Sequence, residues 1–155
     1  MRILYTEDSP AIYGSALELL GILQGNGKLA DFEVFHTADY AAAVDLLSNN
    51  GPFDAIISDY RIPGRNASLR TGGMDLLIYV RQQLGNLPFV FLSSTPPENI
   101  LEVADRLGVR LNKEDIFDKS LTLITGVLEI VQERFSPKET ATLFTAGITD
   151  EAKPS

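Results

Sequence analysis

Short apolar runs alternate with helix-like segments five times along this chain, and this alternation limits the fold more than any other feature of the sequence. The runs at residues 53–58 and 88–94 are apolar almost throughout. Strands that are apolar on both faces are typical of parallel sheets whose two faces are covered by helices. We therefore predict an α/β domain in which a five-stranded parallel sheet carries helices on both faces.

Boundary residues locate the individual elements. Strands are expected at residues 2–5, 32–36, 53–58 and 88–94, whereas the segments GVRLN and DIFDK compete for the fifth strand. Helices are expected in the segments between these strands, and the amphipathic segment LTLITGVLEIVQERF closes the domain. Ser9 with Pro10 marks the start of the first helix, and Thr95 with Glu98 is predicted to form a capping box for the fourth.

The length and composition of the chain narrow the class of protein. A chain of 155 residues suits one domain, which we place at residues 1–135, followed by a polar tail or linker at residues 136–155. The net charge of −8 argues against a nucleic-acid-binding surface, which needs a basic face. Cysteine is absent, which excludes thiolate chemistry. No apolar run is long enough for a signal peptide or a membrane span, so we expect a cytoplasmic protein.

Acidic, hydroxyl and amino side chains stand at the ends of the predicted strands. Glu7 and Asp8 follow the first strand, Asp59 follows the third, Ser93 ends the fourth and Lys119 follows the fifth. In an open parallel sheet the carboxyl ends of the strands lie at one edge, and ligands bind there. We therefore expect these side chains to converge. His36, the only histidine, has no obvious partner and no predicted catalytic role.

Three carboxylates that meet at one edge need a neutralising group. At about 4–5 Å and an effective dielectric constant of about 20, each pair of like charges costs roughly 3–4 kcal/mol. Either one pKa rises or a divalent cation binds, and oxygen ligands without a suitable histidine favour Mg²⁺. With Lys119 and Ser93 to bind phosphoryl oxygens, the arrangement is typical of phosphoryl transfer in which Asp59 is the nucleophile.

Five segments of the chain resemble, in the same order and register, the receiver domains of bacterial two-component response regulators. They are TEDS, DAIISDYRIPG, GMDLLIYVR, LPFVFLSS and IFDKSL, and the resemblance covers residues 1–135. It implies a doubly wound, flavodoxin-like sheet with strand order 2-1-3-4-5. It also implies a phosphorylation-activated signalling switch, which catalyses its own phosphorylation and dephosphorylation and is not an enzyme in the usual sense.

The resemblance assigns a role to each residue at the sheet edge. Asp59 matches the phosphorylated aspartate, and Ser93 and Lys119 match the residues that bind the phosphoryl group. The implied ligands of Mg²⁺ are Glu7, Asp8, Asp59 and the backbone carbonyl of Arg61. The implied phosphoryl donor is a histidine kinase or phosphotransfer protein, and the implied downstream partner is a protein that contacts the fourth helix, fifth strand and fifth helix. No nucleic-acid or membrane partner is expected, and the sequence leaves open a homodimer and a receiver excised from a longer protein.

A long loop is the first departure from the family pattern. A glycine about four residues after the proline is usual, but here GRNASLRTG separates Pro63 from Gly73. The loop is longer by some six residues and carries Arg65 and Arg70. These arginines either are solvated, or shield the acidic pocket, or recognise a phosphorylated partner, since loops at the mouth of a site often carry specificity.

Two further departures from the family pattern lie on either side of Lys119. Ile116 stands where the family has a switching aromatic residue, which places the usual output mechanism in doubt. Ser120 stands where the family has a proline after a cis bond, and because a cis bond before a residue other than proline costs about 2.5–4 kcal/mol, we expect this bond to be trans. Lys113 remains an alternative to Lys119 as the pocket lysine.

Two other functions compete with the signalling switch. An aspartyl-phosphate phosphohydrolase needs a second acid two residues after its nucleophile, and Arg61 at that position cannot serve. A receiver-like interaction domain that is not phosphorylated is the stronger alternative, because Ile116 and Ser120 depart from the family pattern.

Overall fold

The computed structural model describes residues 1–135, and in them one parallel sheet is formed by five strands in the order β2-β1-β3-β4-β5. The strands are β1 (Arg2–Thr6), β2 (Glu33–Thr37), β3 (Ala55–Ser58), β4 (Phe89–Ser93) and β5 (Ile116–Asp118). This arrangement confirms the predicted doubly wound, flavodoxin-like α/β fold. The predicted tail at residues 136–155 lies outside the described part of the chain.

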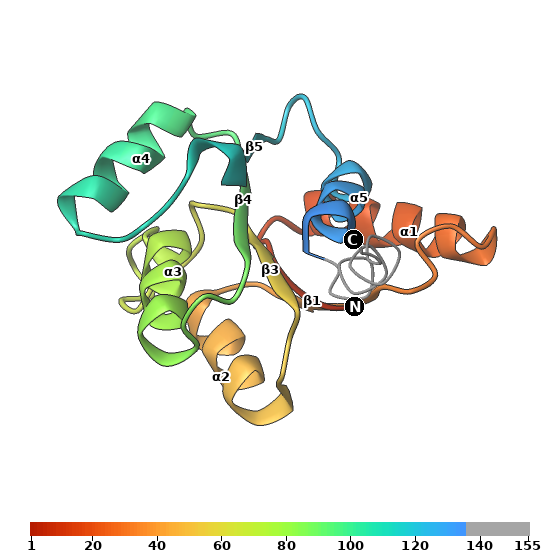
Figure 1. The fold of residues 1–155 in the computed structure, drawn as a ribbon, viewed down its shortest axis with the longest axis horizontal. Coiled ribbons are helices and arrows are strands. Elements are labelled where there is room, and N and C mark those ends of the chain that lie inside the picture. Colours follow the sequence, from red (N-terminus) through yellow and green to blue (C-terminus); the bar gives the residue numbers. More distant parts are fainter. Residues whose placement is uncertain (136–155) are drawn as a thin grey trace, which may run out of the picture.

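Helices cover both faces of the sheet, as Figure 1 shows. They are α1 (Pro10–Gly25), α2 (Tyr40–Asn50), α3 (Gly72–Gln83), α4 (Pro97–Arg106) and α5 (Ile124–Phe135), with a 3₁₀ turn, η1 (Lys113–Asp115), before β5. In Figure 1, α1 and α5 lie on one side of the sheet and α2, α3 and α4 lie on the other. None of these helices is long and apolar enough to span a membrane.

The central strands supply side chains to two separate apolar cores. Successive residues of a strand point to opposite faces of the sheet, so neighbouring positions enter different layers. Leu4, Ile56 and Phe91 are buried with α2, α3 and α4, whereas Ile3 and Ile57 are buried with α1 and α5. This burial on both faces explains why β3 and β4 appear in the sequence as continuous apolar runs.

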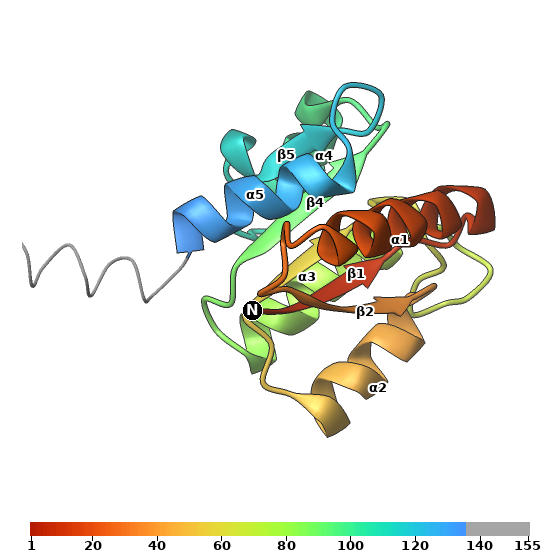
Figure 2. The ribbon, with the colours of Figure 1, turned by 90° about the vertical axis from the view of Figure 1, so that its right-hand side faces the viewer.

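The strand register brings the ends of the central strands together. Thr6 at the end of β1 pairs with Ser58 at the end of β3, and Ser93 at the end of β4 pairs with Asp118 at the end of β5. The residues that follow these pairs, including Glu7, Asp59 and Lys119, therefore emerge at one edge of the sheet. In Figure 2 this is the edge toward which the strand arrows point.

The predicted capping box at the start of α4 is wrong. The N-cap residue of α4 is Pro96, whose side chain makes no capping hydrogen bond. Because α4 begins at Pro97, Thr95 lies one residue too early to cap it. The backbone N–H of Thr95 instead donates a hydrogen bond to Ser93 Oγ, at 3.2 Å. By contrast, α1 begins at Pro10 after Ser9, as predicted, although the Ser9 side chain makes no capping hydrogen bond.

The fifth strand comes from the segment DIFDK and not from GVRLN. It contains only the three residues Ile116–Asp118, and Lys119 follows it directly. Lys113 begins the η1 turn that precedes this strand, so it lies at the opposite end of β5 from Lys119. The Lys119–Ser120 bond is trans, because within the described residues the only cis peptide bond is Gly51–Pro52.

Candidate functional site

Three carboxylates meet at the carboxyl edge of the sheet. One oxygen from each of Glu7, Asp8 and Asp59 lies within 4.8 Å of the others. The backbone fixes two of them, because the N–H of Glu7 donates to Thr37 O at 3.0 Å and the N–H of Asp59 donates to Thr6 O at 2.9 Å. These bonds extend the strand ladder one residue past β1 and β3. Glu7 and Asp59 are buried, and Asp8 is partly exposed.

Lys119 joins the two buried carboxylates. Its Nζ atom lies 2.7 Å from Glu7 Oε1 and 2.9 Å from Asp59 Oδ2. Burial alone would lower the pKa of the Lys119 ammonium, but the hydrogen bonds and negative charges of Glu7 and Asp59 outweigh burial and raise that pKa above its usual value. Lys119 is therefore a fixed positive charge at the centre of the site at neutral pH.

The remaining carboxylate oxygens also have partners. The second oxygen of Glu7 accepts a hydrogen bond from the backbone N–H of Ser9 at 3.0 Å, and Asp59 Oδ1 accepts one from the N–H of Tyr60 at 2.7 Å. Hydrogen bonds to these oxygens offset the cost of burying polar groups. The two buried acids are thus held in place as acceptors.

Arg70, from the long loop between β3 and α3, neutralises the third carboxylate. Its Nη2 atom donates hydrogen bonds to Asp8 Oδ2 and to the backbone carbonyl oxygen of Arg61, the latter at 2.8 Å. Of the three interpretations left open for the loop arginines, this contact corresponds to shielding of the acidic pocket. Arg65 makes no such contact and lies instead beside Tyr40 and Asp75.

The long loop returns to the site at Gly73. The N–H of Gly73 donates to the carbonyl oxygen of Tyr60 at 3.1 Å, and a Cβ atom built on Gly73 would lie 2.6 Å from the backbone oxygen of Asp59. Only a residue without a side chain allows the start of α3 to approach the site backbone this closely. This close approach explains why position 73, where the resemblance to receiver domains places the family's glycine, is occupied by a glycine.

Ser93 ends β4 beside this cluster and is buried. Its hydroxyl oxygen accepts the hydrogen bond from Thr95, and its carbonyl oxygen accepts one from the backbone N–H of Lys119 at 3.0 Å. In the described part of the chain no hydrogen bond joins Ser93 to Asp59. The structure thus brings Glu7, Asp8, Asp59 and Lys119 into direct contact or close proximity and places Ser93 on the adjoining strand.

Ile116 and Phe117 point to opposite faces of β5. Ile116 is buried in the core formed with α2, α3 and α4, and the Phe117 ring packs on the other side, where the guanidinium of Arg134 lies 5.7 Å from its centroid. The isoleucine at the position of the family's switching aromatic residue is thus a core side chain.

His36 has a contact that the sequence did not indicate. Its Nε2 atom lies 2.8 Å from the backbone oxygen of Glu7 and donates the hydrogen bond, because a carbonyl only accepts. The imidazole also stacks on Tyr13, with ring centroids 3.9 Å apart. Its position at the end of β2, beside β1, is the signal that would have placed it near Glu7.

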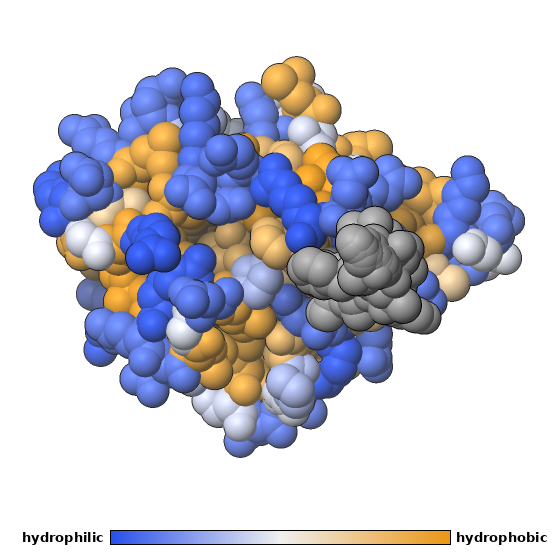
Figure 3. Space-filling model, viewed as in Figure 1, coloured by the Kyte–Doolittle hydropathy of each residue, from blue (hydrophilic) through white to orange (hydrophobic). Residues whose placement is uncertain are grey.

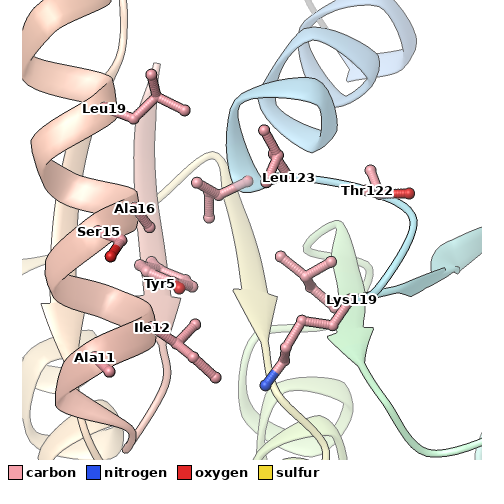
Figure 4. A pocket seen from close by; sticks show the side chains of 11 residues that line it. Tyr5, Ala11, Ile12, Ser15, Ala16, Leu19, Lys119, Thr122 and Leu123 are labelled. Carbon is pink, nitrogen blue, oxygen red and sulfur yellow. The ribbon is translucent and has the colours of Figure 1, made fainter.

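An apolar groove of about 440 Å³ leads away from Lys119. It lies between α1 and the segment that joins β5 to α5, and Figure 4 shows Ile12 and Ala16 of α1 facing Leu123 across it. Leu123 and Leu121 are 65% and 83% exposed. In Figure 3 apolar side chains stand out above the surrounding polar surface on this connecting segment. The site therefore has an exposed apolar surface directly beside its lysine.

The residues at the site fit a hard divalent cation. The three carboxylates and the Arg61 carbonyl offer only oxygen ligands, which Mg²⁺ prefers. A single nitrogen of Arg70 contacts both Asp8 Oδ2 and Arg61 O. These two oxygens therefore lie close enough together to bind one positively charged group. The carboxylates of Glu7, Asp8 and Asp59 could together hold a metal ion, and the binding of Mg²⁺ by these residues and the Arg61 carbonyl stays a prediction.

Solved structures of receiver domains resemble this chain. The receiver domain of the Francisella response regulator 1452 has a TM-score of 0.59 and 22% identity, with 86% of this chain and 97% of that chain covered. The non-phosphorylated HemR receiver domain of Leptospira biflexa has a TM-score of 0.58 and 21% identity, with coverages of 87% and 94%. The chemotaxis response regulator CheY4 of Vibrio cholerae has a TM-score of 0.58 and 25% identity, with coverages of 85% and 96%.

These similarities confirm the receiver-domain fold that the sequence motifs predicted. No protein-family model matches the chain, and no curated protein matches it significantly. At identities of 25% or less the likeness establishes how the chain folds, while the function has to be argued from the residues of the site.

Proposed function

We propose that this chain is a phosphorylation-activated signalling switch in which Asp59 accepts a phosphoryl group from the phosphohistidine of a histidine kinase or phosphotransfer protein. The observation that carries this proposal is the contact of Lys119 with both Glu7 and Asp59 inside a cluster of three carboxylates. A buried aspartate that only packed the end of a strand would have no need of two acidic neighbours and a lysine.

The transfer step exchanges one bond to phosphorus for another. An oxygen of the Asp59 carboxylate attacks the phosphorus atom, the new O–P bond forms, and the P–N bond to the donor imidazole breaks. The imidazole leaves with the bonding electron pair and takes up a proton. Hydrolysis returns the switch to its unphosphorylated state. Water attacks the phosphorus atom, inorganic phosphate leaves, and the carboxylate of Asp59 is restored.

Each site residue has a separate role in the transfer step. Lys119 holds an oxygen of Asp59 in place and supplies positive charge for the incoming phosphoryl oxygens, and Ser93 offers a hydroxyl donor on the adjoining strand. Glu7, Asp8, Asp59 and the Arg61 carbonyl would hold Mg²⁺. When bound, Mg²⁺ neutralises the charge that gathers on the phosphoryl oxygens.

Output is proposed to pass through β5. The backbone N–H of Lys119 is bonded to the carbonyl of Ser93, so a movement of either side chain toward a phosphoryl group acts on the β4–β5 junction. The phosphoryl group carries about −1.5 to −2 charge in place of the single negative charge of the Asp59 carboxylate, and this larger charge attracts both donors. The face formed by α4, β5 and α5 is the proposed contact surface for a downstream protein.

The second candidate function is a receiver-like interaction domain that is not phosphorylated. The contacts of Arg70 with Asp8 and the Arg61 carbonyl favour it, because they neutralise part of the acidic cluster without a metal ion. The isoleucine at position 116 favours it as well, since it has no ring to move between a buried and an exposed position.

Acetyl phosphate and Mg²⁺ separate the two candidates. The wild-type chain is expected to gain one alkali-labile phosphoryl group, measured by intact-protein mass spectrometry. Asp59→Asn should abolish this gain, whereas Asp105→Asn, which removes an exposed carboxylate on α4, should leave it unchanged. Absence of an adduct on a folded wild-type chain that binds Mg²⁺ would establish the unphosphorylated interaction domain instead.

A further inference from the structure

Arg70 contacts two of the four groups that the proposed function assigns to the metal ion, Asp8 and the Arg61 carbonyl. Its Nη2 atom bonds both to Asp8 Oδ2 and to Arg61 O. The proposed function would place Asp8 and the Arg61 carbonyl among the groups that hold Mg²⁺. Two positive charges held by the same pair of oxygens would repel each other at short range, so the arginine and the cation compete for these oxygens.

The loop that carries Arg70 is built to hold it near the site. The N–H of Gly64 donates to Leu69 O at 2.9 Å and the N–H of Leu69 donates to Asn66 O at 2.9 Å, which folds the loop onto itself. The loop is also fastened to α3, because Asp75 Oδ2 accepts hydrogen bonds from the N–H of Arg65 at 3.0 Å and from the Thr71 hydroxyl at 2.7 Å. In Figure 2 the loop (yellow-green) lies beyond the strand ends.

The two cations of the site differ in how easily they leave it. The side chain of Lys119 is 17% exposed and bonded to two buried carboxylates, whereas that of Arg70 is 46% exposed and its carboxylate partner is 22% exposed. An exposed ion pair is weakened by solvent much more than a buried one. Arg70 is therefore the cation that an incoming metal ion displaces, while Lys119 stays.

We propose that Arg70 is a tethered competitor of the divalent cation, which neutralises Asp8 in the metal-free protein and must be released before the metal binds. This inference rests on the metal site of the proposed function. It has two consequences: the chain binds Mg²⁺ more weakly than its carboxylates alone would, and metal binding is coupled to release of the Arg70 side chain from the site.

Isothermal titration of Mg²⁺ into the folded chain tests the competition directly. Arg70→Ala is expected to bind Mg²⁺ roughly three- to thirty-fold more tightly than wild type, which is the range for removing one charge-assisted hydrogen-bonded pair at a partly exposed site. Arg65→Ala is the matched control, because it removes the same charge from the same loop without touching the acidic cluster, and its affinity should equal that of wild type. Circular dichroism verifies that each variant is folded.

A second measurement follows the arginine itself. In a chain labelled with ¹⁵N-arginine, the side-chain signal of Arg70 (assigned by its loss in Arg70→Ala) should shift on addition of Mg²⁺ toward that of a free guanidinium, and the Arg65 signal should not. Equal Mg²⁺ affinities of wild type and Arg70→Ala would overturn the competition and leave the metal site standing. Weaker binding in Arg70→Ala would also overturn it, because Arg70 would then assist the metal. Failure of every variant to bind Mg²⁺ would overturn the metal site itself, and the inference with it.

Discussion

The Nζ atom of Lys119 lies 2.7 Å from Oε1 of Glu7, although 112 positions separate the two residues in the sequence. Glu7 is 2% exposed, and the same lysine also reaches Asp59. The contact joins the end of the first strand to the end of the fifth, which are not neighbours in the sheet. The contact therefore links the two sides of the site across β3 and β4, the strands that lie between β1 and β5.

Replacing Lys119 is expected to destabilise the fold in a pH-dependent way. Lys119→Met leaves two buried carboxylates without their cation, so its free energy of unfolding at pH 7 should fall by about 2–3 kcal/mol. Because the pKa of Lys119 is raised in the folded chain, its stabilising effect is fully present below the usual value of 10.5 and is lost as pH rises through the raised pKa. Urea unfolding in EDTA, from pH 7 to 11, measures the difference from wild type.

The difference in unfolding free energy between wild type and Lys119→Met reports the effect of Lys119 alone. Burial, followed by the charges of Glu7 and Asp59, also raises the pKa of Tyr5, but Tyr5 is present in both chains and cancels to first order. Lys113→Met serves as the control, because Lys113 lies before β5 and should change stability little. A difference that already disappears between pH 7 and 9 would contradict the raised pKa.

Two glycine-to-alanine changes are expected to have opposite effects on stability. In Gly73→Ala the new methyl group would overlap the backbone of Asp59 and Tyr60, so we expect a loss of about 2–3 kcal/mol together with slower phosphorylation. In Gly21→Ala, inside α1, the methyl group has no neighbour within 4 Å among residues 1–135, and helix propensity should stabilise the chain by up to about 1 kcal/mol. Thermal unfolding of both variants, with acetyl phosphate kinetics for Gly73→Ala, tests this; a neutral Gly73→Ala would contradict the close approach.

The apolar groove beside Lys119 is expected to serve the protein donor and not the chemistry. Leu123→Asp places a charge in the groove, and the rate of phosphoryl transfer from a phosphohistidine protein that phosphorylates wild type should fall roughly tenfold. The rate from phosphoramidate, a small donor that needs no groove, should stay within about twofold because the side chains that contact Asp59 are unchanged. Quantitative gel or mass analysis of the phosphorylated fraction measures both rates.

Leu107→Asp supplies the comparison for this experiment. Leu107 is 53% exposed, close to the 65% of Leu123, but it lies at the end of α4 and outside the groove. Its variant should accept phosphoryl groups from both donors like wild type. If Leu123→Asp is phosphorylated more slowly by both donors to the same extent, the substitution damages the site itself. If its rate with the protein donor equals that of wild type, the groove does not bind the donor.

The sequence alone determined the architecture and the edge of the sheet at which the site lies. Alternating apolar runs and helical segments are local patterns typical of a parallel sheet, so the sheet and the convergence of its strand ends could be predicted from them. The strand order was implied by the resemblance to receiver domains. Glu7, Asp8 and Asp59 were placed correctly near one another, because Glu7 and Asp8 are the first two residues after β1 and Asp59 is the first residue after β3.

Tertiary structure alone decided the details that depend on contacts between distant segments. The sequence left Lys113 and Lys119 as alternatives, because β5 is only three residues long and two segments competed for it. The capping box at Thr95 failed because the path of the chain after β4 starts α4 one residue later than the local pattern suggests. The partner of Arg70 was equally hidden, since a long loop has no periodicity and the position of its side chains is set by the hydrogen bonds that fold the loop back onto α3.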